Sequence, residues 1–237
     1  MTESYMNILG SPLPLWLGIG IMLLSGVGWG ALNGGAISRI RMPALIVTLA
    51  TWEISKGVAF KIGGGQTIGF LPSKLGLLGY GNIGGIPIAV VIFAAVAVVA
   101  YFVLQHTTFG RSVYAVGGNP VSAWLSGIKV RSIQFRVYVI SGLLAGLAGV
   151  IITGRVMSAA MVTLQGLELD TIAAVTVGGV SLAGGKGNLI GVVLGVLIIG
   201  VINNGMSILG AGPSVQGVVK GTIIFIAVAV DYIRKKQ

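Results

Sequence analysis

The stretch that decides the fold is IPIAVVIFAAVAVVAYFVL, residues 86–104, in which no side chain carries a charge. A helix of about 20 apolar residues is long enough to cross the hydrocarbon core of a bilayer. We therefore predict a membrane-spanning helix over this stretch. Comparable apolar runs predict further spans at 13–33, 43–60, 137–153 and 218–232.

The composition extends this interpretation to the whole chain. Of the 237 residues, 55% are hydrophobic and 8% are charged, whereas a soluble domain carries roughly 25% charged residues. A soluble enzyme, a disordered protein and a nucleic-acid-binding domain are excluded as leading interpretations. The net charge of +10 lies mostly in short segments between apolar runs, where it sets orientation in the bilayer. We predict one all-α transmembrane domain over residues 1–237.

The chain offers few ligands for a metal and many small residues for helix packing. It has no cysteine and one histidine, His106, so we predict neither a metal site nor a catalytic residue. Its forty glycines favour helices that approach one another closely in a membrane. Small residues four positions apart predict packing seams at Gly26/Gly30/Gly34, Gly142/Gly146, Ser141/Ala145/Gly149 and Gly191/Gly195.

The C-terminal third is less regular. Residues 171–183 and 189–202 are uncharged except for Lys186 between them, and each run is shorter than the roughly 20 residues of a comfortable span. They are either tilted short spans or the two halves of a re-entrant hairpin near 171–202. The first alternative gives seven crossings and the second gives five.

The distribution of basic residues predicts the sidedness. Lys and Arg concentrate in loops on the cytoplasmic side of a membrane. This rule predicts a cytoplasmic side for Arg39 and Arg41, for the basic segment 106–136 and for the C-terminal residues 234–236. Alternation then predicts that the loop 63–85, the acidic pair Glu168 and Asp170, and the N-terminus lie outside. Both counts of crossings are odd, so both place the C-terminus in the cytoplasm.

A few polar residues fall where apolar ones are expected. Glu53 and Lys56 share a helix face and can pair, and Glu53 lies about 15 Å along the helix that starts at Pro43. Ionisable groups at that depth often mark a transport pathway, but a structural pair is the other alternative. Asp170, Asn203 and Asn204 are the remaining candidates for a pathway.

The stretch GVSLAGGKG, residues 179–187, invites comparison with a phosphate-binding loop. That motif requires Gly, four residues, and then Gly-Lys-Ser/Thr. Here Gly187 stands where the hydroxyl residue is required. We predict a tight glycine turn between two helices, and no ATP bound by this chain.

The segment FGRSVYAVGGNPVSAWLSGI, residues 109–128, contains signals for a short helix. Asn119 is a good N-cap, Pro120 suits the first helical position, and Gly127 suits the C-terminal end. A short capped helix on the basic side offers a compact surface to a cytoplasmic partner. The alternative is an ordinary connecting loop.

This segment resembles the cytoplasmic coupling loop of bacterial ABC importer permeases for monosaccharides, of the ribose, xylose and galactose type. The family pattern is similar to F-G-R-x-x-Y-A-x-G-G-N-P-x-A-A-x-x-S-G-I, and this chain keeps nearly all of it. Four further blocks resemble the same branched-chain amino acid and monosaccharide permease family. They are LIVTLAT at 45–51, ELDTIAAV to GGVSLAGG over 168–185, NNG at 203–205 and VVKG at 218–221.

The resemblance implies a permease subunit of the bacterial inner (plasma) membrane that is not itself an enzyme. A second permease chain would complete the pathway, and a periplasmic or extracellular sugar-binding protein would deliver a monosaccharide. ATP-binding cassette subunits would hold ATP and magnesium, so this chain would bind no cofactor. The residues implied in coupling to those subunits are Gly118, Asn119, Pro120, Ala123, Ser126 and Gly127.

Two departures from the family pattern bear on this interpretation. The family often has Glu-Ala-Ala where this chain has Val121-Ser122-Ala123, which removes a charged contact. The chain also lacks the front spans of the family, so we expect an N-terminally truncated member. The alternatives are a stand-alone secondary transporter or channel, with Glu53 as its ion-responsive group, and a truncated remnant that does not transport.

The sidedness is testable because the chain contains no cysteine. We expect Lys74→Cys to react with a membrane-impermeant thiol reagent on intact cells. We expect Lys129→Cys to react only after permeabilisation, because the basic segment faces the cytoplasm. Labelling at position 129 but not at position 74 on intact cells would contradict the topology.

Overall fold

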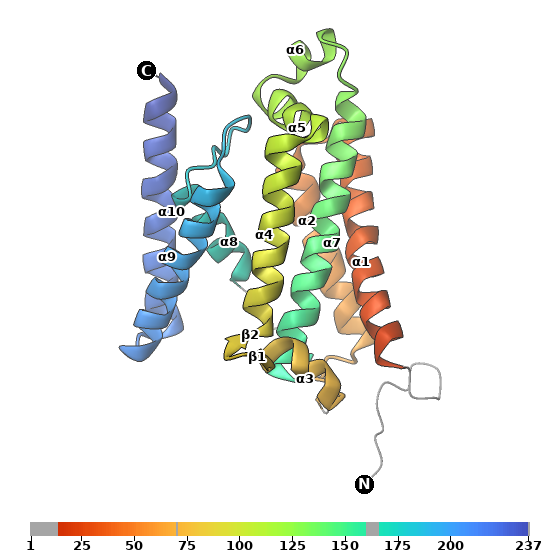
Figure 1. Cartoon of the computed structure of the whole chain (residues 1–237), viewed down its shortest axis with the longest axis vertical. Coiled ribbons are helices and arrows are strands. Elements are labelled where there is room, and N and C mark those ends of the chain that lie inside the picture. Colours follow the sequence, from red (N-terminus) through yellow and green to blue (C-terminus); the bar gives the residue numbers. More distant parts are fainter. Residues whose placement is uncertain (1–13, 70, 160–165, 237) are drawn as a thin grey trace. The chain divides into compact units, whose positions relative to one another are not determined.

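The computed structural model describes residues 14–69, 71–159 and 166–236, and the predicted all-α membrane fold is confirmed (Figure 1). The first helix, α1, continues into one π-helical turn, η1, and a two-stranded hairpin precedes α4. The elements are α1 Leu15–Gly35, η1 Ala36–Ile40, α2 Ala44–Ile62, α3 Ser73–Tyr80, β1 Asn82–Ile83, β2 Ile86–Pro87, α4 Ile88–His106, α5 Thr108–Gly118, α6 Pro120–Leu125, α7 Val130–Val156, α8 Leu167–Val177, α9 Leu189–Ile208 and α10 Pro213–Lys236.

Among the described residues, four helical segments are long and apolar enough to cross a membrane. They are Leu15–Ile40, Ile88–His106, Val130–Val156 and Leu189–Ile208. The predicted spans over 43–60 and 218–232 fall within α2 and α10, and α10 contains the shorter apolar segment Pro213–Ala229. The expected beginning of the first span at residue 13 lies outside the described residues.

The predicted end of the second short run at Asn203-Asn204 is wrong. Helix α9 has 20 residues and continues through both asparagines to Ile208. By contrast, α8 has 11 residues, which corresponds to about 16 Å and does not cross a bilayer. The two runs are therefore not equal halves of a hairpin. Asn203 is tolerated inside α9 because its amide has a partner, described below.

The prediction of loops over 63–85 and 106–136 is partly wrong. Helix α3 forms within the first segment, where its Gly79 lets the backbone lie against Gly154 and Arg155 of α7. Helix α5 forms within the second segment, and the Thr107 hydroxyl caps it by accepting a hydrogen bond from the Gly110 amide at 3.1 Å. Gly79 favours a loop by its sequence but here serves close packing.

The span predicted to begin at Ile86 begins two residues later. Gly84 and Gly85 both have positive φ, +59° and +86°, and form a two-residue turn of the kind that glycine pairs favour in hairpins. The hairpin pairs Ile83 with Ile86. Ile86 therefore belongs to β2, and α4 starts at Ile88.

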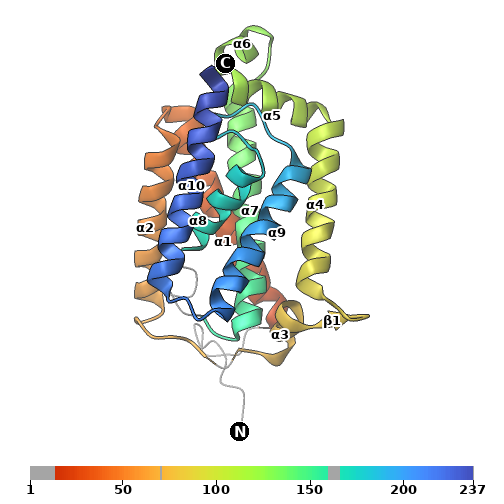
Figure 2. The same cartoon turned by 90° about the vertical axis from the view of Figure 1, so that its left-hand side faces the viewer.

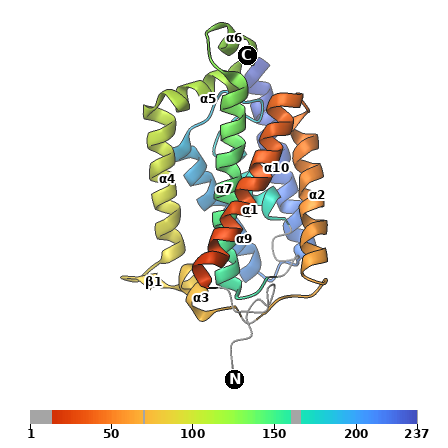
Figure 3. The same ribbon diagram turned by 90° about the vertical axis from the view of Figure 1, so that its right-hand side faces the viewer.

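The chain forms two compact units. The first comprises the described parts of 1–96 and 129–163, and within it α1 lies directly across α7 (Figure 3). A Cβ at Gly30 would collide with the Tyr138 carbonyl oxygen and approach Gly142 Cα at 3.1 Å. The predicted seams at Gly26/Gly30/Gly34 and Gly142/Gly146 are thus confirmed as packing contacts. Gly149 differs, because nothing described lies within 4 Å of a Cβ there.

The second unit comprises the described parts of 97–128 and 164–237. In it α8 packs against both α9 and α10 (Figure 2). Ala173 and Ala174 of α8 and Ile199 of α9 form its buried core. A Cβ at Gly195 would collide with the Ala174 carbonyl oxygen, which confirms the predicted seam at Gly191/Gly195.

We predict that Gly30→Ala destabilises the protein because the added methyl group meets the α7 backbone. Overpacking of this kind costs about 1–3 kcal/mol. The matched control is Gly28→Ala on the same helix, where nothing lies within 4 Å of the new Cβ and alanine favours helix by about 1 kcal/mol. The measurement is the free energy of unfolding in mixed detergent micelles. Equal effects of the two substitutions would contradict the assigned α1–α7 contact.

Candidate functional site

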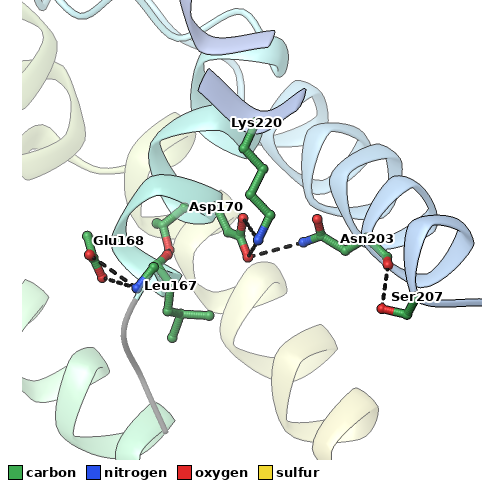
Figure 4. Close-up of polar contacts among 8 residues, drawn as sticks. Leu167, Glu168, Asp170, Asn203, Ser207 and Lys220 are labelled. Atoms are coloured by element: carbon green, nitrogen blue, oxygen red, sulfur yellow. Dashed lines mark hydrogen bonds and ion pairs between the residues drawn. The ribbon is translucent and has the colours of Figure 1, made fainter. Parts of the chain in front are cut away.

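Three helices of the second unit meet at one polar cluster, which consists of Asp170, Asn203 and Lys220 (Figure 4). The Lys220 ammonium on α10 lies 2.7 Å from Oδ1 and 2.9 Å from Oδ2 of Asp170 on α8. The Asn203 amide on α9 donates a hydrogen bond to Asp170 Oδ2 at 3.1 Å. The side chains of Lys220 and Asp170 are 17% and 19% exposed. Asp170 therefore joins all three helices.

The contacts within the cluster compensate the charge of the partly buried Asp170 carboxylate. A charge taken out of water is costly unless an opposite charge and hydrogen bonds compensate it. Asp170 and Lys220 neutralise each other, and Asn203 satisfies a further lone pair of the carboxylate. Asn203 Oδ1 is buried and has no hydrogen-bond partner among the described residues. It is an acceptor to which a hydroxyl group can donate.

The sequence predicted two members of this cluster and missed the third. Asp170 and Asn203 were predicted as pathway candidates, and the structure brings them together. Lys220 was not predicted, although a single charged residue in the apolar segment Pro213–Ala229 is a signal that a buried partner is needed. Asn204 is exposed and has no side-chain hydrogen bond among the described residues, because it points about 100° around α9 from Asn203.

Glu53 lies in the first unit and takes part in local contacts. The predicted pair with Lys56 is confirmed, with Nζ 3.3 Å from Oε1. The Glu53 side chain is 62% exposed, and the Lys56 ammonium also lies 4.3 Å from the centre of the Trp52 ring. A contact with a neighbouring aromatic ring of the same helix is typical of a lysine that stabilises its own helix.

The short helix predicted after Asn119-Pro120 is confirmed as α6. Asn119 Oδ1 accepts hydrogen bonds from the amides of Val121 and Ser122, both at 3.0 Å. Gly127 ends the helix with φ +83°, and its amide donates to the Trp124 carbonyl at 2.9 Å. The helix is thus closed at both ends by its own sequence.

Helix α6 presents apolar side chains outward. Ala123 is buried, at 4% exposed, and forms the inner face. Val121, Trp124 and Leu125 are 66%, 67% and 74% exposed. A loop helix that held itself together would bury these side chains. These three side chains form an exposed apolar patch on α6.

The 179–187 stretch is a hydrogen-bonded glycine turn, as predicted. The Ser181 amide donates to the Lys186 carbonyl at 3.0 Å, and the Gly184 amide donates to the Ser181 carbonyl at 3.0 Å. Gly179, Gly184 and Gly185 have positive φ. The turn ends at Asn188, whose side chain caps α9 by accepting from the Ile190 amide at 3.0 Å.

We predict that Lys220→Met destabilises the protein by about 3–5 kcal/mol, because it leaves the Asp170 carboxylate without its countercharge. The double variant Asp170→Asn/Lys220→Met should recover much of this loss. The control is Lys56→Met, which breaks an exposed pair of about 0–1 kcal/mol. The free energy of unfolding in detergent micelles is the measurement. A double variant as unstable as Lys220→Met would contradict the pairing.

Comparison with known proteins identifies the family. Residues 1–228 match the family described as the branched-chain amino acid transport system / permease component. The chain is 42% identical over 207 residues to the ribose import permease protein RbsC of Bacillus subtilis, covering 86% of this chain and 64% of that protein. It is 40% identical over 235 residues to RbsC of Escherichia coli, covering 98% and 73%.

A relative named for a different sugar is nearly as similar. The chain is 39% identical over 222 residues to the L-arabinose transport system permease protein AraH of Escherichia coli, covering 94% of this chain and 68% of that protein. No solved structure matches the chain. The chain thus spans roughly two thirds of the length of these relatives. With the apolar helices described above, these matches show that the chain is a multi-pass membrane protein and belongs to the branched-chain amino acid transport system / permease component family.

Proposed function

We propose that this chain is the membrane-spanning permease subunit of an ATP-driven importer for a monosaccharide. The observation that carries the proposal is α6, a self-capped helix with an outward apolar face, in a chain of the permease family. Relatives named as ribose and L-arabinose permeases support a small sugar as cargo. We propose one membrane domain over 1–237, with 106–136 as its coupling loop.

The partner proposed for α6 is an ATP-binding cassette subunit in the cytoplasm. An exposed apolar patch with a tryptophan at its centre is typical of a surface that binds a partner. Gly118, Asn119, Pro120, Ala123, Ser126 and Gly127 shape this helix and so act in coupling. Because Val121-Ser122 stands where the family often has Glu-Ala, the docking contact of this chain is apolar rather than charged.

On the transport pathway we propose Asp170 and Asn203; Asn204 has less support, because it is exposed and points away from them. A carboxylate and an amide are the groups that hydrogen-bond sugar hydroxyls, and Asn203 Oδ1 is a buried acceptor without a partner among the described residues. Glu53 has less support, because its side chain is exposed and paired with Lys56. That local pair also disfavours the stand-alone carrier that would use Glu53 as its ion-responsive group.

The remaining parts of the proposed machine lie outside this chain. A second permease chain completes the pathway, and a periplasmic or extracellular sugar-binding protein delivers the sugar. ATP and magnesium belong to the cassette subunit, where hydrolysis shifts the permease between inward and outward states. The proposed location is the bacterial inner membrane, with the C-terminus in the cytoplasm.

We predict that Trp124→Ala weakens the binding of the ATP-binding cassette subunit by at least about 2 kcal/mol, the scale of a buried interface tryptophan. Gly127→Pro should weaken it too, because proline cannot adopt φ +83°. The measurement is the amount of cassette subunit that co-purifies with the tagged permease after washes of increasing detergent concentration.

The control for this experiment is Phe225→Ala on α10, which removes an aromatic side chain that is 76% exposed on an apolar helix. We expect this variant to retain the cassette subunit. Unchanged co-purification with both Trp124→Ala and Gly127→Pro would show that α6 is not the docking helix.

A further inference from the structure

The C-terminal end of α5 touches the glycine turn between α8 and α9, backbone against backbone. A Cβ at Gly117 would lie 2.7 Å from the Gly185 amide nitrogen, and a Cβ at Gly184 would lie 2.7 Å from the Gly117 carbonyl oxygen. A Cβ at Gly185 would collide with Gly118 Cα. These four residues form what we call the glycine contact. A Cβ at Gly117, Gly184 or Gly185 would force the two backbones apart, whereas a Cβ at Gly118 would lie 3.9 Å from Gly185 Cα.

A hydrogen bond beside the glycine contact fixes its register. The Tyr114 hydroxyl donates to the Gly187 carbonyl at 3.2 Å, across 73 residues of sequence. Tyr114 lies three and four residues before Gly117 and Gly118, so all three share one face of α5. Helix α5 and the turn 179–187 also belong to the same compact unit, the second one, although α7 lies between them in the sequence. The same face of α5 therefore contacts the second half of the turn at Gly184, Gly185 and Gly187.

On one side, the glycine contact connects stiffly to α6. A single residue, Asn119, separates α5 from α6. Its amide donates to the Ala115 carbonyl of α5 at 3.1 Å, and its side chain caps α6. Since both bonds come from the same residue, α6 cannot turn freely relative to α5.

On the other side, the glycine contact connects to the polar cluster. The Val180 amide donates to the Val175 carbonyl of α8 at 3.2 Å, and Asn188 caps α9. Helix α8 carries Asp170, and α9 carries Asn203. The turn is thus hydrogen-bonded to both helices that place the carboxylate and the amide.

We infer that the glycine contact transmits the position of the docked α6 to α8 and α9, and so controls the geometry of Asp170 and Asn203. Side chains at a packing interface absorb a displacement by changing rotamer, whereas two backbones in direct contact have no such slack. A movement of α5 therefore moves the turn. This inference rests on the proposed docking of an ATP-binding cassette subunit to α6.

The variants separate transmission from folding. Gly117→Ala pushes the two backbones apart, and Tyr114→Phe removes the hydrogen bond without adding atoms. Gly117→Ala is matched by Gly200→Ala on α9, which also adds a methyl group to a helical glycine but has nothing within 4 Å of the new Cβ. Gly185→Ala is matched by Gly179→Ala, which has the same kind of positive φ, +82° against +76°, in the same turn but no neighbour within 4 Å.

The experiment is hydrogen–deuterium exchange of the full permease in complex with its ATP-binding cassette subunit. Exchange in α8, Leu167–Val177, is compared with and without a non-hydrolysable ATP analogue and magnesium. We expect the nucleotide to change exchange in α8 of the native chain and of both controls. In Gly117→Ala, Gly185→Ala and Tyr114→Phe we expect that change to fall by at least half, while the cassette subunit still co-purifies.

The outcomes are distinguishable. A nucleotide response in Gly117→Ala and Tyr114→Phe equal to that of the native chain overturns the transmission role and leaves docking intact. Loss of co-purification in Tyr114→Phe, which adds no bulk, also overturns it, because the contact would then support docking itself. If the native chain fails to retain the cassette subunit at all, the proposed function fails, and this inference fails with it.

Discussion

The bilayer supplies no water to an unpaired backbone group or an isolated charge, and this constraint governs the structure. Backbone groups are satisfied within helices, so helices associate through close packing of small residues and through hydrogen bonds between polar side chains. Gly26 and Gly30 meet α7 in this way, and Gly178 and Gly195 join α8 to α9. The carboxylate of Asp170 is accepted among these helices because Lys220 and Asn203 compensate it.

The same constraint distinguishes α6 from the membrane-spanning helices. Apolar side chains belong in lipid or in a core, yet α6 is a six-residue helix of a polar loop and exposes Val121, Trp124 and Leu125. Within the second unit, the side chains of Asp170 and Lys220 are largely enclosed, and those of Val121, Trp124 and Leu125 are exposed. The glycine contact connects the helix that precedes α6 with the turn between α8 and α9, which carry Asp170 and Asn203. A permease driven by a cytoplasmic ATPase requires such a connection from a docking surface to the groups that meet the cargo.

The sequence predicted the features that depend on local chemistry. The Asn119 cap, the Pro120 start and the Gly127 end of α6 are set by neighbouring residues, as is the glycine turn at 179–187. Features that depend on distant partners were missed. Gly79 and Gly117 lower helix propensity, and their close contacts with the backbones of Gly154, Arg155 and Gly185 involve residues distant in the sequence. The contacts of Asn203 in α9 and of Lys220 in α10 depend on one carboxylate that is distant in the sequence.

The central claim is that α6 is the surface to which an ATP-binding subunit docks, and the absence of cysteine from the chain permits a direct measurement. A single cysteine is introduced as Trp124→Cys, and native membranes are treated with a short thiol-to-amine cross-linker. If α6 is the docking helix, we expect a product with the combined mass of this chain and an ATP-binding cassette subunit. The same treatment of Phe225→Cys on α10 should yield no such product. Cross-linking to the cassette subunit from position 225 but not from position 124 would contradict the account.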